Sequence, residues 1–405
     1  MKYLDVFAGA GGLSEGFAQN GHTPIAHVEM NEVACKTLLT RNAFHYLCGK
    51  DRLEVYTDYL LKNITQEQLL KEVPKRLVTS VINTEITSRS LHGVINTIDA
   101  HLPTHGVDLI IGGPPCQAYS RLKRHAIDEV GDSRNYLYRY YAQFLISYTP
   151  KAFLFENVPG LLSANGGKHF KNMKAYFRRI GYTIYDQVVD ASHFDVLQAR
   201  ERLFIVGIRK DIEHEAFEIS ERTRTVHSVS DLLADLPAID TAAPAADVTY
   251  SGRPTSYLNQ TRLRTQNDVL TQHIARPVNS NDRAIYRHAI EAWNSREHRI
   301  RYSDLPAQLQ THRNKHAFLD RYKVVNPKGL SHTVVAHISK DGHYYIHPSI
   351  DQSRSLSVRE AARIQAFPDN YYFEGGRTAQ FHQIGNAVPP KLASHLAAAI
   401  TQAIS

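Results

Sequence analysis

One cysteine in the chain stands where covalent chemistry could occur. Cys116 lies in the segment GGPPCQAYS (residues 112–120), directly after an apolar run, 107–111, that predicts a strand. In open parallel sheets, ligands bind beyond the carboxyl ends of the strands, and two successive prolines restrict the backbone before the thiol. Most free cysteines are buried and inert. The loop position and the polar neighbours of Cys116 instead favour a nucleophile.

A carboxylate and two arginines follow other predicted strands. Glu156 comes at the end of the apolar run 152–155, so it would face the same crevice as Cys116, although a helix cap or a surface acid is the alternative. Residues 198–202 read QARER and precede a predicted strand, 203–208. Alternate residues of an extended segment point the same way. Gln198, Arg200 and Arg202 would then share one face, to bind phosphates or orient the acid, or merely to form a surface salt-bridge ladder.

A glycine-rich loop follows the first predicted strand. Residues 5–17 read DVFAGAGGLSEGF, and glycines at a strand-to-helix turn let a ligand approach the backbone closely. Ser14 stands where the dinucleotide fingerprint has its third glycine, so the loop alone could be a plain turn. Glu29 ends the second predicted strand about 20 residues further on, where an acid can bind a ribose. Together these features indicate a nucleoside-bearing cofactor.

The first half of the chain alternates short apolar runs with amphipathic stretches, which predicts an α/β fold with a parallel sheet. We interpret residues 45–75 as an insertion between strands. The predicted strands are 3–7, 24–29, 77–82, 107–111, 152–155 and 203–208, and the predicted helices are 14–20, 32–41, 136–148, 168–180, 357–367 and 395–404.

The regular pattern weakens between about residues 221 and 330. Residues 251–325 contain 13 Lys and Arg against 6 Asp and Glu, a surplus that equals the +7 net charge of the whole chain. A local basic excess fits a phosphate backbone better than it fits general solubility, although a solvated polar face is the plainer alternative. We therefore predict two domains, 1–218 plus 351–405 and, between these segments, 219–350.

Composition narrows the class of protein. The chain has 405 residues, of which 42% are hydrophobic and 21% charged, as in ordinary globular proteins. No apolar run approaches the roughly 18 to 20 residues that span a bilayer, and the start of the chain lacks the apolar core of a signal peptide. Three cysteines cannot form a disulfide framework, so we expect a reducing cytosol, and no spacing predicts a metal site.

In this order and spacing, the motifs resemble those of the DNA cytosine-5 methyltransferases, in particular the bacterial restriction-modification type. The glycine loop resembles the first cofactor motif of that family. The segments PPCQ (114–117), ENV (156–158) and QARER (198–202) resemble its nucleophile, acid and arginine motifs. SVREAARIQAFP (357–368) resembles its late helix and QIGNAVPP (383–390) its last motif. The resemblance runs from Tyr3 to the final helix, except in the basic segment, where the family has its variable target-recognition domain.

The resemblance implies an S-adenosylmethionine-dependent, Rossmann-like sheet with a smaller irregular target-recognition domain. It implies that Cys116 adds to C6 of a flipped cytosine, that Glu156 binds N3, and that Arg200 and Arg202 anchor the base and a phosphate. The methyl group of S-adenosyl-L-methionine then passes to C5. The implied cofactor contacts are Phe7, Gly9, Ala10, Gly11, Gly12, Glu29, Met30, Glu85, Ile86, Pro115, Leu137, Asn386 and Val388.

Two parts of this assignment are less regular. The acid that contacts the adenine is Glu85 or, as the fallback, Asp99, and Tyr119 stands where the family usually has Phe. For DNA, the implied contacts are Gln117, Ser120, Arg121 and Arg134 in a loop that would close over the flipped base. In the basic domain, which should enter the major groove, the candidates are Arg262, Arg264 and Arg276, together with Gln266, Asn267, Gln272 and Asn281.

Double-stranded DNA is the expected partner, and the resemblance to the restriction-modification type implies a cognate endonuclease that acts separately. A monomer would suffice. We expect the protein in the bacterial cytosol, associated with the nucleoid when bound to DNA. The main alternative is an RNA cytosine-5 methyltransferase of the transfer-RNA-modifying type, which would carry a Cys-Phe-Thr tripeptide that is absent here. An amino-methylating enzyme would have an aromatic residue in place of Cys116. A non-catalytic relative would have lost Cys116 or Glu156, and a nicotinamide-dependent oxidoreductase would explain neither the cysteine loop nor the arginines.

Overall fold

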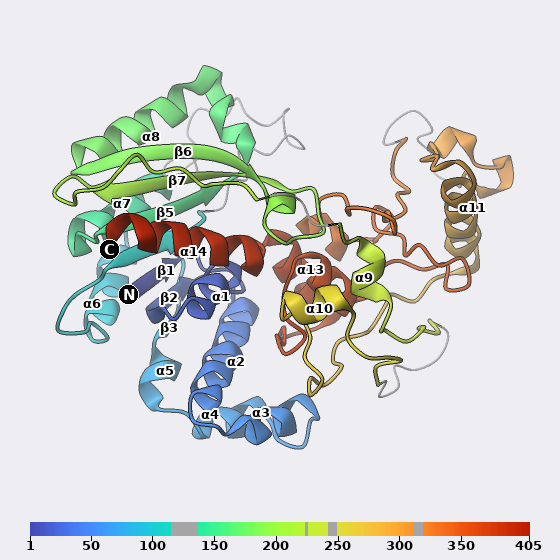
Figure 1. Cartoon of the computed structure of the whole chain (residues 1–405), viewed down its shortest axis with the longest axis horizontal. Coiled ribbons are helices and arrows are strands. Elements are labelled where there is room, and N and C mark those ends of the chain that lie inside the picture. Colours follow the sequence, from blue (N-terminus) through green and yellow to red (C-terminus); the bar gives the residue numbers. More distant parts are fainter. Residues whose placement is uncertain (115–136, 223–225, 242–248, 312–318) are drawn as a thin grey trace. The chain divides into compact units, whose positions relative to one another are not determined.

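The computed structural model describes residues 1–114, 137–222, 226–241, 249–311 and 319–405, and these form two compact units (Figure 1). The first unit comprises Met1–Phe194, Arg200–Arg224 and Ala387–Ser405, and the second comprises Asp195–Ala199 and Thr225–Asn386. This division by packing places 351–386 with the second unit. The assignment of 219–350 to target recognition remains a prediction.

A seven-stranded sheet forms the centre of the first unit, with the strand order β3-β2-β1-β4-β5-β7-β6. The first five strands in this order pair in parallel, whereas β7 is antiparallel to both of its neighbours. We call the edge at which the parallel strands end the carboxyl edge. The strands are β1 (Lys2–Val6), β2 (Thr23–Glu29), β3 (Val81–Asn83), β4 (Leu109–Gly112), β5 (Ala152–Asn157), β6 (Tyr182–Asp190) and β7 (Glu201–Arg209).

Helices cover this sheet, and the last one brings the end of the chain back to its beginning. Helix α14 packs on α1 so closely that a Cβ atom on Gly16 would overlap Ala393, which requires glycine there. The helices of this unit are α1 (Gly12–Gln19), α2 (Glu32–Cys48), α3 (Leu53–Leu60), α4 (Gln66–Lys71), α5 (Lys75–Thr79), α6 (Leu91–Asp99), α7 (Leu137–Tyr148), η3 (Pro159–Leu162), η4 (Ala164–Gly167), α8 (Lys168–Arg179), η5 (Ala191–His193) and α14 (Pro390–Ile404).

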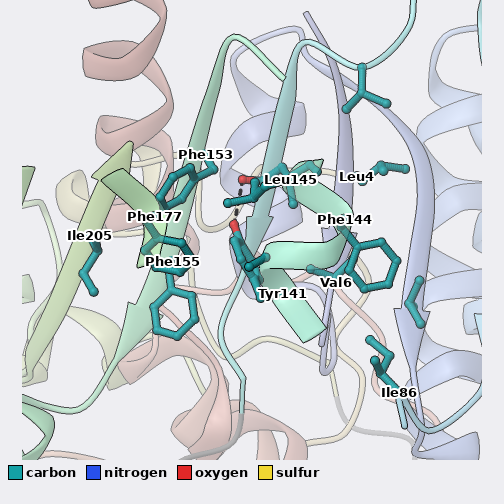
Figure 2. Close-up of a cluster of buried hydrophobic side chains, with 14 of the residues drawn as sticks. Leu4, Val6, Ile86, Tyr141, Phe144, Leu145, Phe153, Phe155, Phe177 and Ile205 are labelled. Atoms are coloured by element: carbon teal, nitrogen blue, oxygen red, sulfur yellow. Dashed lines mark hydrogen bonds between the residues drawn. The ribbon is translucent and has the colours of Figure 1, made fainter. Parts of the chain in front are cut away.

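An aromatic cluster on one face of the sheet fixes β4 and β5 (Figure 2). The ring of Tyr141, from α7, lies 5.1 Å from that of Phe155, and Phe153 and Phe177 pack around it. The buried Tyr141 hydroxyl donates to the main-chain oxygen of Leu154 or of Ile110, each 3.0 Å away, so its burial leaves no polar atom unpaired. This packing holds rigid the two strands that lead to Cys116 and Glu156.

The second unit has its own core around α11, where Ile285, Tyr286, Ile290 and Trp293 line the buried face. Among its described residues, strand pairing is limited to isolated bridges, such as the one between Val324 and Ile346. Its helices are α9 (Val229–Leu233), α10 (Ser256–Gln260), α11 (Ser280–Arg296), η6 (Tyr302–Asp304), η7 (Ala307–Leu309), η8 (Ala336–Ser339), α12 (Val358–Ile364) and α13 (Arg377–Asn386).

Buried ion pairs surround α12 within the second unit. The guanidinium of Arg363 lies 2.6 Å from carboxylate oxygens of both Asp235 and Asp369, and all three side chains are at most 1% exposed. Arg354 pairs with Glu360 at 2.7 Å. The arginines of the late-helix motif therefore organise the interior of this unit.

The predicted fold class is confirmed, but several elements differ from the predictions. The sheet is mixed, because β7 runs antiparallel to β5, and the alternating strand β6 was not predicted at all. The predicted strand 77–82 is half helix, since a short apolar run suits either structure. The predicted insertion 45–75 consists of the end of α2 followed by α3 and α4, and the long helix α11 lies in the segment expected to be irregular. No helix among the described residues is long and apolar enough to cross a membrane.

Candidate active site

Glu156 lies near the end of β5, at the carboxyl edge, and forms an ion pair across the sheet. Its Oε1 is 2.9 Å from Nε of Arg202 on β7, and the two side chains are only 15% and 13% exposed. Burial raises the pKa of Glu156, while the charges of Arg202 and Arg200 act in the opposite direction. The net rise in pKa makes this carboxyl group easier to protonate than an exposed one.

The other two residues of the arginine motif have hydrogen-bond partners away from Glu156, although the charge of Arg200, like that of Arg202, lowers the pKa of Glu156. Arg200 is fully buried and donates from Nη2 to the main-chain oxygen of Ala387 at 2.8 Å, which ties β7 to the returning C-terminal segment. Gln198 belongs to the second unit, where its side-chain nitrogen donates to Oε1 of Gln365 at 2.9 Å. Of the three residues, Arg202 makes the ion pair with the acid.

β4 leads the chain past this acid toward the cysteine. A Cβ atom on Gly113 would lie 2.5 Å from Oε2 of Glu156, so only glycine fits there without displacing the carboxylate. The Asn157 side chain donates to the main-chain oxygen of Pro114 at 3.4 Å. The chain thus enters the cysteine loop in contact with the acid motif. Cys116 itself lies outside the described residues, as do Pro115, Gln117, Ser120, Arg121 and Arg134.

The glycine loop after β1 is held in shape by Glu29. Phe7, Gly9 and Gly11 have φ values of 61°, 55° and 81°, so three of five successive residues are left-handed. The main-chain nitrogens of Gly9 and Asn31 donate to the two carboxylate oxygens of Glu29, each at 2.8 Å. Glu29 therefore fixes the loop, and it retains lone pairs for a ligand.

Asp5 was not predicted as a site residue, yet it is the most unusual side chain beside this loop. It is 1% exposed, and neither carboxylate oxygen has a hydrogen-bond partner within the described part of the chain. Burial, reinforced by the charge of Glu29, raises the pKa of Asp5 well above its usual range. An unpaired buried carboxyl group is destabilising unless a ligand supplies a donor. The signal in the sequence was an acid inside an apolar strand just before the glycines.

The remaining predicted cofactor residues fall at different places. Glu29 pairs with Asn83 between β2 and β3, which puts the exposed Glu85 just beyond the carboxyl edge. Asp99 instead ends α6, where it accepts a hydrogen bond from Tyr148 at 2.9 Å, so position favours Glu85. Two of the others differ in exposure, since Ile86 is 5% exposed and Met30 is 60% exposed. Leu137 begins α7, and Val388 precedes α14 in the first unit. Asn386 ends α13 in the second unit.

The predicted DNA contacts in the basic segment are not equivalent. Arg264 is 3% exposed, forms an ion pair with Asp235, and lies 3.3 Å from the ring centre of Tyr250. Its guanidinium is committed to the interior, so the expectation that Arg264 contacts DNA is corrected. Arg276 donates to the main-chain oxygens of Ile338 and Lys340 at 2.8 and 2.9 Å. Arg262 is exposed and stays a candidate.

Comparisons with known proteins identify the family of this chain. The family model of the C-5 cytosine-specific DNA methylases matches residues 79–402. Type II methyltransferase M.Bpa9945I of Bacillus paralicheniformis is 42% identical and is aligned over 100% of this chain and 99% of its own length. Type II methyltransferase M.AgeI of Thalassovita gelatinovora is 30% identical over 100% of both chains.

Solved structures show the same fold. A putative DNA modification methyltransferase encoded within a prophage of E. coli superposes with a TM-score of 0.65 at 22% identity, and the alignment covers 100% of this chain and 99% of that one. The resemblance drawn from the motifs is thereby confirmed. The chain belongs to the C-5 cytosine-specific DNA methylase family, whose members are DNA (cytosine-5-)-methyltransferases.

Proposed function

We propose that this chain transfers a methyl group from S-adenosyl-L-methionine to C5 of a cytosine within a specific short DNA sequence. The observation that carries the proposal is the largely buried pair of Glu156 and Arg202 at the carboxyl edge, beside the strand that leads to Cys116. A raised pKa is the property required of a carboxyl group that must protonate a ring nitrogen.

The residues at the end of β1 fit S-adenosyl-L-methionine. The ammonium group of the cofactor would donate a hydrogen bond to the carboxyl of Asp5, which has no partner among the described residues. The two ribose hydroxyls of the cofactor would donate hydrogen bonds to Glu29. A Cβ atom on Gly9 would meet nothing within 4 Å, so there is open space at the loop. When bound, the cofactor supplies an electrophilic methyl group. Further contacts are proposed for Phe7, Ala10, Gly11, Gly12, Met30, Glu85, Ile86, Pro115, Leu137, Asn386 and Val388.

The protein's own residues would then make C5 of cytosine reactive. The Cys116 thiolate forms a bond to C6 of the base, and Glu156 holds the proton that N3 takes up, so that electron density reaches C5. Arg200 and Arg202 keep the acid and the base in place. After methylation, loss of the C5 proton breaks the bond between sulfur and C6 and releases Cys116 as the thiolate.

Access to the base requires that it leave the duplex, at a cost of a few kcal/mol. We propose that the loop with Gln117, Ser120, Arg121 and Arg134 closes over the flipped base and that residues 219–350 read the flanking sequence in the major groove. Because the substrate is chromosomal DNA, the enzyme would act in the bacterial cytosol, as a monomer. There it would protect host DNA from a separate cognate endonuclease.

The direct test is a methyl-transfer assay with purified protein, labelled cofactor, and either duplex DNA or transfer RNA. We expect 5-methylcytosine in the digested DNA and no label in the RNA. Cys116→Ser should abolish transfer, and Glu156→Gln should slow it by about 10²-fold or more, while both variants still bind DNA. Label in transfer RNA alone, or methylation of the exocyclic nitrogen, would contradict the proposal.

A further inference from the structure

We propose that the outward face of α8 is a second contact surface for DNA, located on the catalytic unit and formed chiefly by Lys168 and Lys171. This inference rests on the proposed function, because it assumes that duplex DNA lies across the carboxyl edge. It adds a phosphate-binding surface outside the basic segment 219–350. The ligand is the sugar-phosphate backbone, which carries no sequence information.

The charge of α8 is of one sign. The helix carries Lys168, Lys171, Lys174, Arg178 and Arg179, and residues 158–181 contain no Asp or Glu. Exposed helices generally mix both signs, because pairs at i and i+4 stabilise them. A surplus of five on one short segment is large beside the +7 of the whole chain. Such a concentration is the electrostatic signature of a surface that meets phosphates.

The exposed cations are available for a partner. The apolar face of α8, with Phe170, Met173 and Phe177, is buried against the aromatic core, so the opposite face points to solvent. Lys174 is occupied by an ion pair with Asp186 at 2.7 Å. Lys168 and Lys171 are exposed, and neither forms an ion pair with any acid among the described residues. Their charges are therefore not neutralised by the part of the chain that the structure describes.

The position of these lysines along the helix is unfavourable for the helix itself. Lys168 and Lys171 lie in the first turn, where the macrodipole favours anions and a cation destabilises the helix. Arg178 and Arg179 lie in the last turn, where cations are favourable. Residues that disfavour the element in which they lie are expected at functional sites. The cations at the start of α8 therefore destabilise the helix, whereas those at its end stabilise it.

The two ends also lie at opposite edges of the sheet. From the carboxyl edge, where Glu156 lies, the chain passes through η3 and η4 directly into the start of α8. The helix then runs along β6, and its last residues lead to Tyr182 at the beginning of that strand, at the other edge (Figure 1). Lys168 and Lys171 are therefore on the side of the catalytic acid, and Arg178 and Arg179 are on the far side.

This arrangement provides a matched control on a single helix. We would compare the full-length variants Lys168→Ala/Lys171→Ala and Arg178→Ala/Arg179→Ala, which remove the same charge. Affinity for a duplex of arbitrary sequence would be measured by fluorescence anisotropy between 50 and 200 mM salt. Melting temperature, cofactor affinity, and single-turnover methylation at saturating DNA would be measured in parallel.

We expect the lysine variant to bind DNA more weakly, by up to about eightfold per lost contact at 0.1 M salt, with a salt slope smaller by about 0.9 per contact. Its melting temperature should not fall, and its single-turnover rate should be unchanged. The arginine variant should keep its DNA affinity and melt at a slightly lower temperature. Equal losses of affinity in both variants, or no loss in the lysine variant, would overturn the inference. A wild-type protein that neither binds nor methylates DNA would instead defeat the proposed function.

Discussion

Nε of Arg202 lies 2.9 Å from Oε1 of Glu156, and this ion pair joins two antiparallel strands of an otherwise parallel sheet. The parallel strands β4 and β5 bring Gly113, which precedes the cysteine motif, and the acid to one edge. The antiparallel strand β7 is what places an arginine beside them. Burial raises the pKa of Glu156 and the arginine limits that rise, so the pair sets the protonation of the proposed catalytic acid.

Replacing Arg202 should shift the pH dependence of catalysis. Arg202→Gln removes a cation that lowers the pKa of Glu156, so the pKa should rise further. If the protonated carboxyl is the active form, the fall in rate at high pH should move to higher pH, even though the variant is slower overall. Single-turnover rates measured across pH 5–10 test this. If the fall in rate occurs at the same pH in Arg202→Gln, or persists in Glu156→Gln, then that fall reports the titration of another group.

Adding one methyl group at residue 113 should disable the site without unfolding it. In Gly113→Ala, the new Cβ would lie 2.5 Å from Oε2 of Glu156, so the carboxylate must move from its place beside Arg202. We expect the single-turnover rate to fall by about 10²-fold, the contribution of a positioned general acid. Affinities for cofactor and DNA should stay within about twofold. Unchanged turnover would mean that the acid tolerates displacement.

The unpaired carboxyl of Asp5 should matter for cofactor binding and not for folding. Asp5→Ala removes the acceptor proposed for the cofactor's ammonium, and a charged hydrogen bond of this kind is worth about 1.5–3 kcal/mol. Calorimetry should therefore show S-adenosyl-L-methionine affinity reduced by more than about tenfold. The melting temperature of the free protein should not fall, because the carboxyl has no partner among the described residues. A lower melting temperature with normal affinity would indicate a structural role.

The ion network around α12 predicts a large loss of stability in the second unit. Arg363→Ala leaves the buried Asp369 without its closest cation and leaves Asp235 with Arg264 alone among the described residues, which costs about 3–5 kcal/mol. Lys36→Ala, which breaks the exposed pair with Glu32, is the control and should cost less than about 1 kcal/mol. Urea unfolding of both variants tests the difference. Similar small decreases in the free energy of unfolding of Arg363→Ala and Lys36→Ala would show that the ion network does not stabilise the protein.

Stability should fall as the pH is lowered below neutral, partly because of His27. Burial, with a smaller effect of the nearby His45, lowers the pKa of this histidine to about 4 from its usual 6.5. Between these values the unfolded chain binds a proton that the folded protein does not, so the free energy of unfolding rises with pH. It should therefore decrease as pH falls from about 6.5 to 4. Urea unfolding at pH 7 and 5 should show a smaller pH effect for His27→Gln, and an equal effect would assign the dependence to other groups.

The strands that carry Glu29 and Glu156 to the carboxyl edge could be predicted because each acid ends or follows a short apolar run. The predicted strands 3–7, 24–29, 107–111 and 152–155 do form strands, and parallel pairing brings their ends together. The direction of β7 could not be predicted, because apolar periodicity is the same for parallel and antiparallel strands. That direction decides which arginine meets the acid.

Burial of polar residues was the other property that the sequence could not supply. Arg264 lies in a basic segment and was expected at the surface, yet its partner Asp235 is 29 positions away in sequence. Asp5 belongs to the predicted cofactor motif, but only the packed structure shows that its carboxyl has no hydrogen-bond partner among the described residues. Long-range pairing of charges depends on tertiary contacts, on which local patterns carry no information.

Bisulfite sequencing of a plasmid recovered from cells that express this chain tests the central claim most directly. Cells that express Cys116→Ser serve as the control, with equal protein levels verified. We predict that cytosines at one short, fixed sequence resist conversion in the wild-type sample and convert fully in the control. Complete conversion in both samples, with soluble protein that binds S-adenosyl-L-methionine, would contradict DNA cytosine-5 methylation by this chain.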